Sequence, residues 1–133
     1  MADLSALLAG YQRRLEHVVQ EAPRTLSYRI IGRWAVDTGS SANSWTPNIG
    51  DPVARNVDTT GGSIAPVLGR VDAVTRRISP GDSYSLANGK KYARRLEYAG
   101  WSQRHMPNGA VRVTIAEWQP IVNDAARDAR RIS

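Results

Sequence analysis

Few residues of this 133-residue chain have the types and spacing that catalysis requires. The two histidines, His17 and His105, lie far apart, and the chain has no phosphate-binding loop, nucleophile elbow or paired-histidine zinc motif. Glu97 and His105 could form an acid and base pair, but any chain of this length offers such a pair. We therefore expect no enzymatic activity, no metal site and no cofactor.

The triplet Asp37-Thr38-Gly39 has the letters of an aspartic-protease motif. That motif needs a strand-to-loop setting and a second carboxylate, whereas this triplet follows a predicted helix. We interpret it as a helix cap and a turn.

Cations and aromatic rings gather in one segment that could bind nucleic acid. Its members are Lys90, Lys91, Tyr92, Arg94, Arg95, Tyr98, Trp101, Arg104 and His105. Rings beside phosphate-binding cations are typical of proteins that hold single strands. The simpler interpretation, which we favour, is that the rings pack in the core and the cations form a solvated edge. Arg94, Arg95 and Arg104 are then the candidate contacts to acidic partners or to DNA.

Composition indicates an acidic partner without identifying it. The formal net charge is +6, and arginine binds phosphate and carboxylate groups alike. The absence of cysteine excludes disulfides and thiolate metal sites. No apolar run approaches the roughly 20 residues of a membrane span, and the N-terminus lacks the order of a signal peptide. These features fit synthesis in the cytoplasm, and we expect no membrane partner.

Length predicts a single domain over residues 1–133. Two rows of apolar residues at helical spacing, which we call stripes, each predict a helical segment. The first segment is capped by Asp3 or Ser5, and the second stripe ends near Trp34. The first stripe contains Leu4, Leu7, Leu8, Tyr11, Leu15, Val18 and Val19. Pro23 separates the two stripes, so we expect an N-terminal helical pair, or one helix kinked at Pro23.

Between these helices and the next, residues 39–62 are rich in turn formers and predict a long loop. One or two short strands are expected near Trp45-Thr46 and Ile49. The loop is either a plain surface loop or a segment that orders against a neighbouring subunit. Ser63 then caps a central helix, and residues 82–86 alternate as a half-buried strand does.

The last part of the chain predicts two helical segments. Residues 92–98 have a Tyr and Leu face with an Arg edge, which is typical of a short helix. Residues 111–115 alternate like a strand but also fit a helical face that runs to the end of the chain, and we prefer the helix. Pro120 should kink or split it. The predicted fold is α+β, with an N-terminal helical pair, a central helix, a small mostly antiparallel β-sheet and a C-terminal helix.

Two groups of motifs occur in a fixed order. The first is Val36-Asp37-Thr38-Gly39 followed by Asn43 and Trp45; the second is Tyr92 to Tyr98, then Gly100-Trp101-Ser102-Gln103 and Pro107 to Arg112. In order and spacing, the chain resembles the small neck, tail-completion or minor tail proteins of long-tailed double-stranded DNA bacteriophages. It departs from them at Ser40 and Ser41, where a basic residue is expected nearby, and at Ala99, which stands as an insertion.

The resemblance implies a structural protein of the virion, placed at the head-tail connection. Proteins of this kind form a homo-oligomeric ring around the DNA channel, without a cofactor. The implied partners are copies of the chain, neighbouring portal, adaptor, tail-tube or terminator proteins, and DNA that passes without sequence-specific binding. The expected packing centre of the motif is Trp45, Tyr92, Leu96, Glu97, Tyr98 and Trp101, with Glu97 as a salt-bridge partner. The alternative is a small basic nucleic-acid-binding module.

Overall fold

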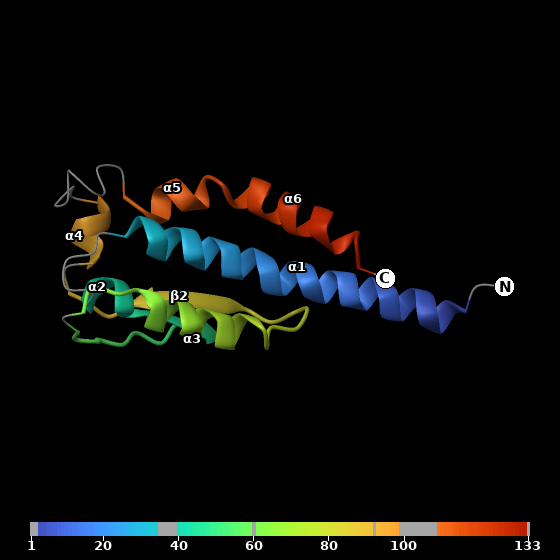
Figure 1. Ribbon diagram of the computed structural model, residues 1–133, viewed down its shortest axis with the longest axis horizontal. Coiled ribbons are helices and arrows are strands. Elements are labelled where there is room, and N and C mark those ends of the chain that lie inside the picture. The colour runs from blue at the N-terminus through green and yellow to red at the C-terminus, as the bar shows by residue number, and fades with distance from the viewer. Residues whose placement is uncertain (1–2, 35–39, 60, 92, 99–108, 133) are drawn as a thin grey trace.

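A computed structural model describes residues 3–34, 40–59, 61–91, 93–98 and 109–132 (Figure 1). The elements are, in chain order, α1 (Leu4–Arg33), α2 (Ser40–Asn43), β1 (Trp45–Ile49), α3 (Ala65–Thr75), β2 (Tyr84–Asn88), α4 (Ala93–Tyr98), α5 (Val111–Ile115) and α6 (Trp118–Ala129). The fold is α+β, as predicted. Among the described helices, none combines the length and the hydrophobicity of a membrane-spanning segment.

Helix α1 is the axis of the molecule. It is a single helix through Pro23, which corrects the predicted helical pair and agrees with the alternative of one helix. It is capped by Asp3, whose carboxylate accepts a hydrogen bond of 2.9 Å from the N–H of Ser5, and it continues through Pro23 to Arg33. A proline inside a helix costs about 3 kcal/mol. Packing offsets this cost, because α6 lies along one side of α1 and α3 along the other (Figure 1).

The sheet has two antiparallel strands, in the predicted places. Trp45 of β1 lies opposite Asn88 of β2, and Ile49 lies opposite Tyr84. The second strand begins two residues later than expected. Pro47 is tolerated because each strand of a two-stranded sheet has one unpaired side. A missing N–H on that side removes no hydrogen bond between the strands. The predicted long loop also contains the short helix α2, which local patterning did not indicate.

The main core lies where the C-terminal half of α1 meets α3, the sheet and the start of α5. It consists of Ile30, Ile31, Trp34, Ala42, Trp45, Val67, Val71 and Ala110. The rings of Trp34 and Trp45 meet edge to face, with 5.1 Å between their centroids. A smaller cluster joins Ala22 of α1 to Ile121 and Ala125 of α6. Together the two clusters pack α3 and the sheet, and separately α6, against α1.

The C-terminal segment is helical from Val111, as preferred over a strand, but it divides into α5 and α6. The break falls at Ala116 and Glu117, upstream of Pro120. Pro120 therefore lies in the first turn of α6. Backbone N–H groups in the first turn have no partner within the helix, so the missing N–H of proline breaks no helical hydrogen bond. The predicted split is confirmed, and it begins before the proline.

Candidate functional site

The motif segment is organised around the carboxylate of Glu97. Glu97 lies on α4 and is 4% exposed. Its Oε1 accepts hydrogen bonds of 2.7 Å from the N–H groups of Ala110 and Val111. Its Oε2 accepts from the N–H of Arg112 at 2.9 Å and from the Arg112 Nε at 3.1 Å. We call this arrangement the Glu97 cap.

In the Glu97 cap, a side chain of α4 accepts the hydrogen bonds of the N–H groups at the start of α5. The first N–H groups of a helix have no partner within the helix, and they carry partial positive charge. Ala110, the residue before α5, offers no side-chain hydrogen bond. Glu97 supplies the missing acceptor and is also paired with the Arg112 guanidinium. The carboxylate thus fastens α4 to α5.

Electrostatics keep Glu97 ionised. Burial alone raises the pKa of a carboxyl group, but here the hydrogen bonds from the backbone of Arg112, Val111 and Ala110, and then from the Arg112 side chain, outweigh it. The pKa of Glu97 is therefore below its ordinary value. A carboxylate has about four acceptor positions. With four donors already bound, Glu97 is poorly placed to exchange a proton with a substrate.

Gly109 is required by the closeness of Glu97. Its φ is +79°, in the left-handed region that glycine adopts without cost. A Cβ at this position would overlap both the carboxylate and the backbone oxygen of Glu97. The glycine of the Pro-x-Gly-x-Val-Arg motif therefore lets the chain pass directly beside the buried carboxylate.

The predicted packing centre is brought together only in part. Trp45 is buried against Trp34 in the main core. Tyr98 is 60% exposed, and its ring lies under the Arg112 guanidinium, with 4.9 Å between the Arg112 Cζ and the ring centroid. Arg112 was not predicted as a site residue, although it is the last residue of its motif.

Several predicted positions lie outside the described residues. Tyr92, Trp101 and Arg104 belong to this group, as does the triplet at 37–39. Arg95 and Leu96 are described as part of the α4 backbone only, without their side chains. Arg94 is exposed on α4, as expected for a contact residue.

A second polar site lies between β1 and α3. Arg55, Arg70 and Arg77 line a pocket of about 250 Å³, and no carboxylate is among its described lining residues. We call it the arginine pocket. Burial, and then the charge of Arg55, lower the pKa of Arg70. The Arg70 Nη2 donates to the backbone oxygen of Asn43 at 2.5 Å.

Such a pocket is suited to an anion, because guanidinium groups bind phosphate and carboxylate oxygens strongly. The sequence did not reveal it. Arg70 and Arg77 lie seven residues apart, on α3 and just after it, but Arg55 lies in the segment that follows β1 and joins them only through the fold. Within the described parts of the chain, no group of three His, Asp or Glu side chains could hold a metal ion.

No protein-family model, curated protein or solved structure matches this chain.

Proposed function

We propose that this protein is a structural component of a tailed bacteriophage particle, a neck or tail-completion protein that forms a ring around the DNA channel. The observation that carries the proposal is the Glu97 cap. It joins the Tyr-Ala-x-x-Leu-Glu-Tyr motif, which contributes Glu97, to the Pro-x-Gly-x-Val-Arg motif, which contributes Gly109 and Arg112. The two motifs on which the resemblance is based thus contain residues that are in direct contact.

The same contacts support a role without catalysis. The carboxylate of Glu97, which sequence considerations offered as a catalytic acid or base, is held ionised by the start of α5 and by Arg112. Its interactions fix two segments relative to each other. We propose a protein that acts by recognition, without a cofactor.

In this role, each subunit presents one surface to its neighbour in the ring and another to the next ring. Head-to-tail contacts around a closed rotation axis give such an arrangement. The exposed Arg94 on α4, together with Arg95 and Arg104, is proposed to contact acidic surfaces of portal, adaptor, tail-tube or terminator proteins, or DNA that passes through the channel. Such DNA contacts would be to phosphates and independent of sequence.

Deletion of the gene from the phage that carries it tests the role. We expect filled heads and tails to accumulate without joining, and the wild-type gene supplied in trans to restore infectious particles. Mass spectrometry of purified wild-type particles should detect the protein. Normal joining without the gene, or particles that lack the protein, would contradict the proposal.

The arginine pocket favours a second candidate, a small basic nucleic-acid-binding module. Three cations around a pocket whose described lining has no carboxylate could hold a backbone phosphate. The two candidates differ in what the isolated protein does. Tight DNA binding that falls steeply with salt, and that Arg55→Gln with Arg77→Gln abolishes, would favour the second candidate over the first.

A further inference from the structure

The N-terminal end of α1 carries a row of large apolar side chains exposed to solvent. We call it the apolar stripe, and its members and their exposed fractions are Leu4 69%, Leu7 58%, Leu8 54%, Tyr11 61% and Leu15 38%. In Figure 1 this end of α1 projects beyond α6 and beyond the sheet side of the molecule. Ordinary monomers rarely expose a continuous apolar patch of this kind.

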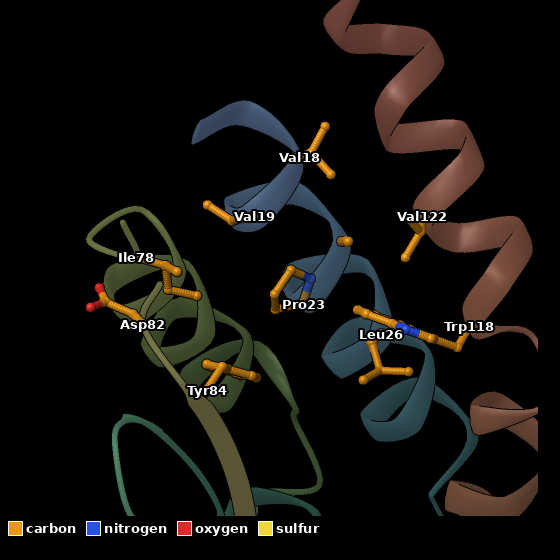
Figure 2. Close-up of a pocket in the computed structure, with 10 residues that line it drawn as sticks. Val18, Val19, Pro23, Leu26, Ile78, Asp82, Tyr84, Trp118 and Val122 are labelled. Atoms are coloured by element: carbon orange, nitrogen blue, oxygen red, sulfur yellow. The ribbon is translucent and has the colours of Figure 1, made fainter. Parts of the chain in front are cut away.

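The stripe leads directly into an apolar groove on the same helix. Figure 2 shows Pro23 and Leu26 of α1 between Ile78 and Tyr84 on one side and Val122 and Trp118 on the other. The groove has a volume of about 470 Å³, and Asp82 is its only charged residue among those described. Val18, Val19 and Ala22 complete its floor. We call it the α1 groove.

The spacing of the stripe indicates that another helix covers it. Leu4, Leu8, Tyr11, Leu15, Val18 and Ala22 follow one another at alternating steps of four and three residues. This alternation is the seam along which two helices pack in a coiled coil. The seam begins on the exposed stripe and ends on the floor of the α1 groove, so a helix that follows it would cover both.

We propose that two copies of this chain pair through α1 in antiparallel orientation, so that the two apolar stripes pack on each other and the first residues of each stripe reach the near end of the α1 groove of the other copy. In this register Leu4 faces Ala22 of the second copy, Leu8 faces Val18, and Tyr11 faces Leu15. Every pair is apolar. Ala22 is only 3% exposed because α6 of its own chain covers it, so Leu4 lies over the near end of the groove and does not fill a space at Ala22. The contact is isologous, because a two-fold axis relates the copies.

A second copy can cover the stripe because the stripe is complementary to itself when the helix direction is reversed. The paired residues, Leu4 to Ala22, span about 27 Å of helix in each copy. One two-fold operation covers the stripes of both copies at once.

The area is also sufficient for a dimer. A large apolar side chain contributes roughly 100 Å² when it is covered, so the stripe of each copy contributes on the order of 500 Å². Two stripes and the groove surfaces that they cover reach about 1,200 Å² or more, the lower end of the range for stable specific interfaces. The pairing does not rest on the role proposed above, and it describes the protein before any larger assembly.

Sedimentation equilibrium of the purified full chain tests the pairing. We expect wild type to have twice the mass of the 14.6 kDa chain, and Leu8→Glu to be monomeric at the same concentrations with an unchanged helical circular dichroism spectrum. Ala6→Glu, also exposed on α1 but on the side away from the stripe, is the matched control and should remain dimeric. A monomeric wild type, or a dimeric Leu8→Glu, would overturn the proposal.

Cysteine cross-linking tests the register, because the chain has no cysteine of its own. Mixed under mild oxidation, Leu8→Cys and Val18→Cys should form a disulfide-linked heterodimer, while neither variant should cross-link to itself. Efficient self-linking of Leu8→Cys would indicate a parallel pairing and contradict the antiparallel register.

Discussion

Glu97 accepts a hydrogen bond of 2.7 Å from the backbone N–H of Val111, a residue fourteen positions further along the chain. A buried carboxylate without donors would cost several kcal/mol. Here the cost is offset by two backbone N–H groups on Oε1 and by Arg112 on Oε2. The contact makes the start of α5 depend on α4, and it is the basis of the first two predictions.

Gly109→Ala should strongly destabilise the protein. The substitution places a Cβ onto the carboxylate and backbone oxygen of Glu97, and it also forces alanine into a positive φ. We expect a loss of roughly 2 to 5 kcal/mol in the free energy of unfolding, measured by urea denaturation at fixed protein concentration. Gly81→Ala is the control, because its φ is +96° and no atom lies within 4 Å of its added Cβ. Gly81→Ala should lose only about 1 to 2 kcal/mol, and equal losses would contradict the predicted overlap.

Glu97→Gln should lower stability at neutral pH and remove part of the acid dependence. The amide keeps the shape, but it replaces one acceptor oxygen with a donor that faces N–H groups, so we expect a loss of about 2 to 4 kcal/mol at pH 7. The pKa of Glu97 is depressed in the folded protein. Its contribution is therefore complete above the unfolded pKa of about 4.3 and disappears as the pH falls through the folded pKa.

Urea denaturation over a pH series measures this linkage. The difference in the free energy of unfolding between wild type and Glu97→Gln should be constant from pH 7 to about 5, and it should shrink below that range. Glu16→Gln, on the exposed surface of α1, makes the same change of charge and should show little difference at any pH. A difference that stays constant down to pH 2 would contradict an ionised Glu97.

The two core tryptophans should respond differently to replacement by phenylalanine. The Trp34 Nε1 donates to the Ser41 hydroxyl at 2.7 Å, whereas the buried Nε1 of Trp45 has no hydrogen-bond partner among the described residues. Trp34→Phe breaks a hydrogen bond, and Trp45→Phe removes an unpaired donor. With similar volume lost at both positions, Trp34→Phe should be the less stable variant by about 1 to 3 kcal/mol in thermal or urea unfolding. Equal stability would contradict this difference.

The elements that the sequence predicted well are those with local patterns. The period of the apolar residues indicated α1, α3 and α6, and alternation together with turn formers indicated β1 and β2. The N-cap of α3 is Ile64, one residue after the predicted Ser63, although the Ser63 hydroxyl still accepts a hydrogen bond of 3.2 Å from the N–H of Ala65. These patterns are local because they depend on neighbours three or four residues away.

What the sequence did not reveal depends on contacts between distant segments. Pro23 interrupts a local pattern, yet packing of α6 and α3 on α1 keeps the helix continuous. The partner of Glu97 could not be identified as Arg112 without the path of the chain at Gly109. Likewise, Arg55 and Arg70 share a pocket only because the fold brings the segment after β1 close to α3.

Reversing the charge of α4 should stop particle maturation without unfolding the subunit. Arg94 is exposed, so Arg94→Glu with Arg95→Glu should leave the circular dichroism spectrum and the urea midpoint close to those of wild type. We expect infectious particles to be abolished in a complementation assay, because acidic partners would repel the new carboxylates. Arg127→Glu with Arg131→Glu makes an equal change of charge at two exposed positions, one in the last turn of α6 and one just after it, and should support growth. Normal infectivity of the α4 variant would contradict the assigned contact surface.

Electron microscopy of intact particles, with this protein located by a tag or by fitting the structure into the density, tests the proposed function most directly. We expect a ring of copies between portal and tail, with α4 turned toward a neighbouring ring or toward the channel. If particles carry no density for the protein at that junction, the proposed role is contradicted and nucleic-acid binding by the isolated protein becomes the function to pursue.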